Sequence, residues 1–154
     1  MSTRSPDKLP VVDAPFCAMA MRMALRRLAQ HYDHALVVTG IKSSQFTILH
    51  ELDRAAAPTI MGALAKRLVL DRSTLGHNLR PLERDGLVRF QNHRRDARAR
   101  YVSLTSKGRA KCRQCLALWE EAELRFKSIF GASNADSLRS TLLDIARSHR
   151  LDVL

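Results

Sequence analysis

Hydrophobic side chains recur every three or four positions in the first third of the chain. Over residues 16–34 this spacing predicts an amphipathic helix, which Asp13 or Pro15 would start. Gly40 then breaks the pattern. A second helix is predicted over 45–54, where three apolar residues share one face: Phe46, Leu49 and Leu52.

Residues that accept hydrogen bonds from backbone amides mark the starts of the next helices. Ser43 or Ser44 is expected to cap the second helix, and Asp71 is expected to cap a fourth. Between them, after Pro58, a third short helix is expected to turn four apolar side chains inward: Ile60, Leu64, Ala65 and Leu68.

After Gly86 the helical spacing gives way to alternation of apolar and polar residues. Residues 87–90 and 101–104 alternate in this way, which predicts two antiparallel strands joined by a hairpin with its tip at 92–99. The fold class is therefore mainly α with a small β-hairpin.

Two more helices are predicted after the hairpin. A long helix begins at Thr105 or Ser106 and ends at Gly131. Ser133 and Asp136 resemble a capping box for a last helix, whose apolar residues are Leu138, Leu142, Ile145 and Ala146.

The fourth predicted helix has two chemically different faces. At about 100° per residue, one face carries leucine at 75, 79 and 82. Thr74 and Asn78 flank the opposite face, which carries groups that hydrogen-bond to base edges and phosphates: Ser73, His77, Arg80 and Arg84. This pattern suits a helix in the major groove of DNA, and it also fits the polar face of an ordinary surface helix.

Pro81 lies inside the same predicted helix and removes the hydrogen bond to the carbonyl of His77. Either the helix continues with a kink that tilts Arg84 relative to Ser73, or it ends early and residues 82–85 form a separate turn.

The charge of the chain favours a polyanionic partner. The 154 residues carry a formal net charge of +11, and the pI is about 10.6. Within 89–113, nine Lys and Arg residues stand against a single acid, Asp96. Such clustering favours nucleic acid over an anionic membrane surface as the partner.

The tip of the predicted hairpin contains Arg94, Arg95 and Arg98, which repel one another unless an anion neutralises them. The narrow minor groove of DNA is one such anionic site. Asp96 is expected to pair with a neighbouring arginine and order the tip. The alternative is a loop that only adds solubility.

The hairpin region, LDRSTLGHNLRPLERDGLVRF followed by RRDARARYVSLTSKGR, resembles the MarR family of winged helix-turn-helix regulators. The most specific elements are the motif from Asp96 to Arg98 and the motif from Val102 through Leu104-Thr105 to Gly108. The stretch GIKSSQFTILHEL also resembles the family's second helix. The resemblance covers residues 16–150, and Pro81 departs from it.

The resemblance implies a transcriptional regulator that binds double-stranded DNA as a homodimer, usually a repressor released by a small ligand or by oxidation. It implies that Arg98 enters the minor groove and that Asp96 orders the wing. The expected organisation is a flexible arm at 1–15 and one MarR-like domain at 16–154. Within the domain we expect a winged helix-turn-helix at 43–105 and dimerisation helices at 16–40 and 106–154.

A dimer is also expected from the chain itself. The terminal helices carry more apolar surface than one small head can cover, and these side chains would be partly exposed in a monomer: Phe16, Met23, Leu116, Trp119, Phe126, Phe130, Leu138, Leu142 and Ile145. A two-fold dimer places its reading helices about 34 Å apart, so the operator is expected to be nearly palindromic.

Cys112 and Cys115 form a CxxC pair within the long helix rather than at its start, where the helix dipole lowers a thiol pKa. Lys111 and Arg113 are close enough to favour a thiolate. Packing, redox sensing, a thiol oxidoreductase and a metal site are the alternatives, and packing fits the spacing best. A zinc site would need two further ligands.

Cys17 lies where organic-peroxide sensors of the family carry their reactive cysteine. Those sensors surround it with tyrosines, whereas here only Tyr32 is in the vicinity. The alternative is a small hydrophobe buried at the dimer interface.

The family's ligand cleft lies between the dimerisation helices and the reading head, and possible anchors for an aromatic carboxylate are Arg22, His31, His50 and Arg54. Surface salt bridges explain these residues equally well. The histidines show no metal-ligand spacing, and no catalytic constellation or phosphate loop stands out. We therefore expect no metal, no cofactor and no enzymatic activity.

Three further observations bear on location. Residues 1–15 contain three prolines and no long apolar run, so they do not resemble a signal peptide. No apolar run approaches the ~18 residues of a membrane span. Three cysteines is an odd count for a disulfide framework. We expect a cytoplasmic regulator without a membrane partner; the alternatives are a thiol-oxidation-responsive repressor and an architectural DNA-binding protein of low specificity.

Overall fold

The structure is a computed structural model that describes residues 12–55, 57–92 and 100–151. The elements, in chain order, are α1 (Cys17–Leu36), η1 (Val37–Thr39), α2 (Ser43–Arg54), β1 (Thr59–Ile60), α3 (Met61–Arg67), α4 (Arg72–Arg84), β2 (Val88–Asn92), β3 (Arg100–Leu104), α5 (Ser106–Phe130), α6 (Ala132–Arg147) and η2 (His149–Leu151). The predicted fold class is confirmed, and the predicted elements all occur. The tip residues Arg94, Arg95, Asp96 and Arg98 lie outside the described residues, as does the chain before Val12.

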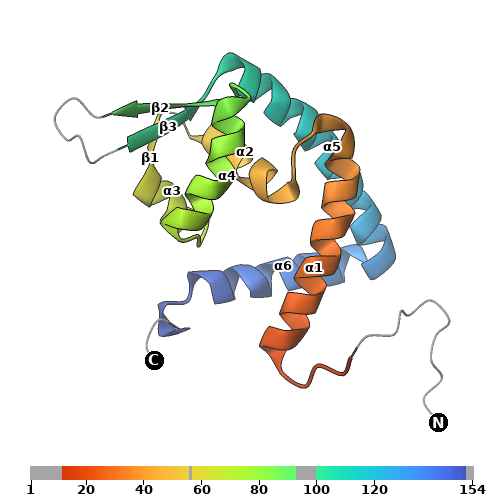
Figure 1. Cartoon of the computed structure of the whole chain (residues 1–154). Helices are drawn as coiled ribbons and strands as arrows, with labels where there is room; N and C mark the ends of the chain where they lie inside the picture. Colours follow the sequence, from red (N-terminus) through yellow and green to blue (C-terminus); the bar gives the residue numbers. More distant parts are fainter. Residues whose placement is uncertain (1–11, 56, 93–99, 152–154) are drawn as a thin grey trace, which may run out of the picture.

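The elements from α2 to β3 form a head around a three-stranded antiparallel sheet of order β1-β3-β2. Val88 pairs with Leu104 and Thr59 with Val102. Figure 1 shows the hairpin of β2 and β3 extending to the side away from α1, with β3 leading back into α5 and with α3 and α4 beside it. β1 was not expected: Ile60 was predicted to face inward from a helix, but it is extended, pairs with Tyr101 and is 42% exposed.

The hydrophobic core lies inside the head and under the first half of α5. Leucines of every head helix are buried in it, together with strand residues from β2 and β3. Its fully buried side chains are Leu36, Ile48, Leu49, Leu64, Leu75, Leu79, Leu82, Val102, Cys112 and Cys115. The polar groups of α4 therefore lie on the side that the core leaves free.

Two predicted helix caps are present and two are not. The Asp71 side chain accepts a hydrogen bond from the Thr74 amide, and that of Thr105 from the Gly108 amide. The predicted serine cap of α2 is wrong, because Oδ1 of Asp33, from α1, accepts from the Ser43 amide at 2.6 Å.

The predicted capping box of α6 is also wrong. Gly131 precedes the helix without a side-chain cap, and the Asp136 carboxylate instead pairs with Nζ of Lys127 at 3.0 Å. The end of α5 and the start of α6 are therefore linked by this ion pair, and Ser133 does not cap the helix.

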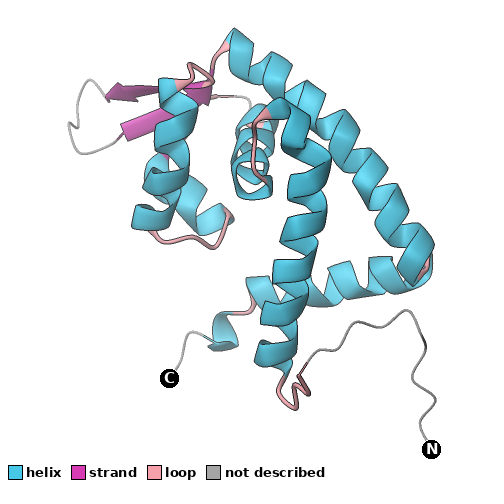
Figure 2. Ribbon diagram, turned by 45° about the vertical axis from the view of Figure 1, so that its right-hand side comes forward, coloured by secondary structure: helices cyan, strands magenta, loops and turns pink. Residues whose placement is uncertain are grey.

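We call α1, the second half of α5 and α6 the stem. Figure 2 shows these helices along three sides of a triangle, away from the sheet. Ala135 is the only buried residue of α6. Most apolar residues predicted to be exposed here are so, including Phe130 at 57% and Leu138 at 46%. Leu116 and Trp119 are exceptions, because both pack against the core, where Trp119 also stacks on Tyr32.

Candidate nucleic-acid interface

The two faces of α4 are as the sequence predicts. Three leucines, at 75, 79 and 82, are buried against the core. The four groups on the opposite face are exposed: Ser73, His77, Arg80 and Arg84. Packing has already decided which way this helix is turned, so its hydrogen-bonding and cationic groups point into solvent without cost to the core. This face can meet base edges and phosphates.

Thr74 and Asn78 have partners inside the protein, so they differ from the four exposed groups. The Thr74 hydroxyl donates to Oδ2 of Asp71 at 2.6 Å, and its amide donates to Oδ1 at 2.7 Å. These two bonds lower the pKa of the Asp71 carboxyl, with the hydroxyl contributing most. Asn78 donates to the Thr74 carbonyl and accepts from Ser44. Thr74 therefore belongs to the cap of α4, and Asn78 links α4 to α2.

Pro81 does not end α4, which continues to Arg84. Of the two alternatives that the sequence leaves open, the continuous helix is the one found. A hydrogen bond from α5 stabilises the turn after the helix, since Lys107 Nζ donates to the Asp85 carbonyl at 2.8 Å. Nε of Arg84 lies 3.2 Å from Oδ1 of Asp85, an exposed pair that leaves the guanidinium accessible to a phosphate.

The base of the hairpin carries two arginines that the sequence analysis counted in the basic cluster but did not assign to the site. Arg89 Nε donates to Ser103 Oγ at 3.3 Å across the register pair. The Arg100 guanidinium lies 4.3 Å from the centre of the Phe90 ring. Both are exposed, and the alternation of polar residues along β2 and β3 was the signal that would have found them.

Cys112 and Cys115 are buried in the core, which argues against a redox or metal role. Burial raises the pKa of Cys112 to about 11, and it outweighs the opposing charge of Arg113. Burial also raises the pKa of Cys115. The expectation that neighbouring cations favour a thiolate is therefore wrong for this pair. Both thiols stay protonated near neutral pH, where they act as small apolar side chains.

Cys17 is exposed at the first position of α1. Tyr32, its suggested partner, lies about four helical turns further along α1. That tyrosine is buried between Trp119 and Glu123, so it does not approach the thiol. Cys17 therefore stands without the tyrosine environment that the peroxide-sensor analogy needs.

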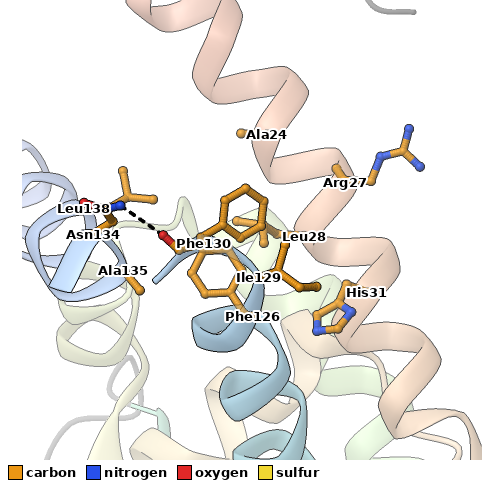
Figure 3. Close-up of a pocket in the computed structure, with 10 residues that line it drawn as sticks. All are labelled: Ala24, Arg27, Leu28, His31, Phe126, Ile129, Phe130, Asn134, Ala135 and Leu138. Carbon is orange, nitrogen blue, oxygen red and sulfur yellow. Dashed lines mark hydrogen bonds between the residues drawn. The ribbon is translucent and has the colours of Figure 1, made fainter. Parts of the chain in front are cut away.

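A pocket of about 610 Å³ opens inside the stem, between α1, the end of α5 and the start of α6. Figure 3 shows the rings of Phe126 and Phe130 in it, facing Leu28 and His31 of α1. Of the four predicted ligand anchors, only His31 lines this pocket. Arg27 lines it too, although the sequence analysis did not select it.

The other three predicted anchors do not meet at this pocket. Arg22 and Arg54 are exposed on α1 and α2. His50 packs with its ring 5.6 Å from that of Phe46, in the head. The four residues therefore do not form one site, because their helices turn them in different directions.

Other kinds of site receive no support from the described part of the chain. Within it, no three His, Cys, Asp or Glu side chains are grouped as metal ligands would be. None of its helices combines the length and the apolarity that a membrane crossing requires.

Comparisons with known proteins agree with this geometry. The model of the MarR family matches residues 39–99, which begin at the last residue of η1 and include α2, β1, α3, α4 and β2. A search of curated proteins gave no match.

Solved structures match over nearly the whole chain. The regulator MosR of M. tuberculosis, in complex with DNA, is 30% identical with a TM-score of 0.80, covering 90% of this chain and 99% of that one. The repressor CouR, bound to a 23-mer DNA duplex, is 29% identical with a TM-score of 0.76, covering 86% and 93%. A mutant MarR of E. coli, complexed with operator DNA, is 25% identical with a TM-score of 0.73, covering 83% and 91%.

The fold is thus shared with these DNA-bound regulators over at least 83% of this chain. This protein belongs to the MarR family of winged helix transcriptional regulators.

Proposed function

We propose that two copies of this chain bind a nearly palindromic DNA operator and regulate transcription, most simply as a repressor. The observation that carries the proposal is the exposed face of α4, where the side chains of Ser73, His77 and Arg80 stand free of the core and make no hydrogen bond within the described part of the chain. These groups enter the major groove, and Arg80 is the residue best suited to guanine. The similar structures of MosR, CouR and MarR were solved with DNA.

The hairpin supplies the second contact in this proposal. Arg89 and Arg100 are already fixed at its base by Ser103 and Phe90. Arg94, Arg95 and Arg98 of the tip, with Asp96 as their ordering partner, remain assignments from the sequence. Together these arginines hold phosphates or the minor groove and supply the salt-dependent part of the affinity.

The stem supports a homodimer. Ile129 is 64% exposed and Leu124 is 68% exposed, and the apolar residues of α6 are accessible along its length. Apolar surface of this extent is costly in water, and a second copy seated on α1, α5 and α6 removes it. An isologous dimer of this kind also gives the two-fold symmetry that a palindromic operator requires.

A small effector has a place in the stem pocket. Its walls are aromatic and aliphatic, while His31 and Arg27 bring polar groups to its α1 side. A ligand with an apolar body and an anionic group matches that lining. CouR of Rhodococcus jostii RHA1, 21% identical to this chain, has been solved with p-coumaroyl-CoA. A ligand held here would change how α1, α5 and α6 meet and so release DNA. We place the protein in the cytoplasm and assign it no catalytic activity.

Selection of bound duplexes from a random DNA pool at ~150 mM salt tests this function, because phosphate contacts alone are weakened at that ionic strength. Recovery of a near-palindrome bound by two copies supports the proposal. Binding without any enriched sequence would contradict it and would favour an architectural DNA-binding protein. The enriched duplex then serves as the probe for a screen of aromatic acids.

A further inference from the structure

One side chain of the stem caps the first helix of the head. Asp33, near the end of α1, accepts a hydrogen bond from the backbone amide of Ser43, the first residue of α2. The two preceding residues, His31 and Tyr32, bond to α5 instead. One turn of α1 thus bonds to α5 through His31 and Tyr32, and to α2 of the head through Asp33.

The bond from Asp33 adds to the one capping bond that α2 supplies for itself, in which Oε1 of Gln45 accepts from the Lys42 amide at 3.0 Å. Lys42 precedes the helix, and the side chains of Ser43 and Ser44 accept no bond from the first-turn amides. A carboxylate at this end also interacts favourably with the helix dipole. The position of the first turn of α2 therefore depends on where α1 places Asp33.

The next residue along α2 connects this turn to α4. Ser44 Oγ donates to Oδ1 of Asn78 at 3.0 Å. The direction of the bond is determined, because Asn78 Nδ2 donates to the carbonyl of Thr74, which can only accept. Among the described residues, this is the only side-chain hydrogen bond between α2 and α4 that the structure records.

This bond lies where the two helices are not fully packed. A hollow of about 390 Å³ separates the first turn of α2 from α4, and Ser44, Asn78 and His77 are among the residues that line it. The buried leucines hold the opposite face of α4, and the Ser44–Asn78 bond adds a directed contact on the exposed side of the helix. The core thus sets which face of α4 is exposed, and this bond links the part of that face near His77 to the first turn of α2.

We propose that Asp33 and Ser44 are positioning residues for DNA reading, which link α1 to the exposed side of α4 through the first turn of α2 and so adjust where His77 and Arg80 lie. The inference rests on the proposed function, since it assumes that α4 reads DNA. It gives Asn78 a structural role in the bond with Ser44 rather than a role in base recognition. A change at the stem reaches α4 through this turn, because Asp33 moves with α1.

The first test compares Ser44→Ala with Ser43→Ala. The two serines are adjacent and both lie in the first turn, but only the Ser44 hydroxyl bonds to α4, while Ser43 contributes its backbone amide. The measured quantity is the ratio of affinities for the selected duplex and for a random duplex of equal length. Ser44→Ala should lower this ratio by about three- to tenfold. Ser43→Ala should leave it unchanged, and Ser44→Thr should restore it.

The second test addresses Asp33. Asp33→Asn keeps an oxygen acceptor and should retain the affinity ratio, whereas Asp33→Ala removes the cap and should lower it. The double variant with Ser44→Ala should be no worse than the poorer single variant, because both act on one turn. The urea midpoint of each variant separates a change in specificity from loss of folding.

The outcomes distinguish this proposal from the one on which it rests. A wild-type protein without sequence preference overturns both. A wild-type preference that Ser44→Ala retains overturns only the positioning role. A second measurement needs no DNA. It follows the NMR chemical shifts of the Asn78 side-chain amide in the free protein, assigned by their loss in Asn78→Ala. These resonances should shift in Ser44→Ala and not in Ser43→Ala. Unchanged resonances in both variants would also overturn the positioning role of the Ser44–Asn78 bond.

Discussion

The Tyr32 hydroxyl donates a hydrogen bond to Oε2 of Glu123 at 2.5 Å, and this bond joins the two longest helices of the stem. The ring of Tyr32 stacks on Trp119 with 4.1 Å between centroids, and Trp119 in turn lies against Phe46 of the head. Aromatic contacts therefore connect the stem to the head beside the polar contacts. A displacement of α1 would disturb the aromatic and the polar contacts together.

Tyr32→Phe removes the hydroxyl but keeps the stack, and it should lower the free energy of unfolding by about 1.5 kcal/mol. Burial, followed by the Glu123 carboxylate, raises the pKa of Tyr32 above its ordinary value of 10.0. The neutral hydroxyl thus contributes stability that is present below pH 10 and is lost as the pH rises above it. Urea titrations at pH 7 and pH 10.5 measure both effects. A Phe variant with wild-type stability at pH 7 would contradict the importance of this bond.

Gly108 allows α5 to start against Leu87, the residue before β2, because a Cβ at position 108 would collide with the backbone carbonyl of Leu87. Gly108→Ala should therefore destabilise the head by about 3 kcal/mol or prevent folding. Gly76→Ala is the matched control, since its Cβ would meet nothing within 4 Å and alanine favours a helix by about 0.5–1 kcal/mol. Thermal unfolding of the two variants should move in opposite directions, and equal shifts would count against the close approach.

Val69 holds the turn between α3 and α4 in a backbone conformation that a β-branched residue rarely adopts, with φ of 53°. Its side chain is 68% exposed, so little packing opposes replacement. Val69→Gly should raise the free energy of unfolding by about 0.5–1 kcal/mol through relief of strain. Val38→Gly, at a position 75% exposed with an ordinary φ, should lower it. A destabilised Val69→Gly in chemical denaturation would show that the turn is not strained.

Replacing Arg80 or Arg98 by alanine is expected to change DNA binding in two different ways. Loss of Arg80 should change which bases are preferred on the selected duplex, at a cost of about 1–3 kcal/mol. Loss of Arg98, assigned from the sequence, should weaken binding to all duplexes and reduce the salt slope by about 1. Arg139→Ala, exposed on α6, is the control for a change of charge alone. If Arg98→Ala keeps the wild-type affinity and salt slope, the wing assignment is wrong.

The three thiols should react with a disulfide reagent in two classes at pH 8. Cys17 is exposed and should react at once, while Cys112 and Cys115 are buried and should react only on unfolding. The pKa of Cys112 is raised from 9.0 to about 11, so the stability it contributes is complete below pH 9 and is lost between pH 9 and pH 11. Rapid labelling of all three thiols in the native protein would restore the redox interpretation of the CxxC pair.

The sequence by itself determined the features that depend on near neighbours. The cap at Asp71, the leucine face of α4 and the alternation along β2 and β3 all arise from residues within a few positions of one another. Helical and strand periodicity express such local geometry directly. For the same reason, the exposed groups of α4 could be identified from the sequence.

Only the tertiary structure decided the contacts between distant residues. The cap of α2 by Asp33, the Ser44–Asn78 bond and the Tyr32–Glu123 bond join residues separated by 10, 34 and 91 positions. Their spacing carries no periodic signal. The burial of Cys112 likewise results from the packing of α5 on the head. Desolvation there raises the pKa of Cys112 by more than the charge of Arg113, its neighbour in the sequence, lowers it.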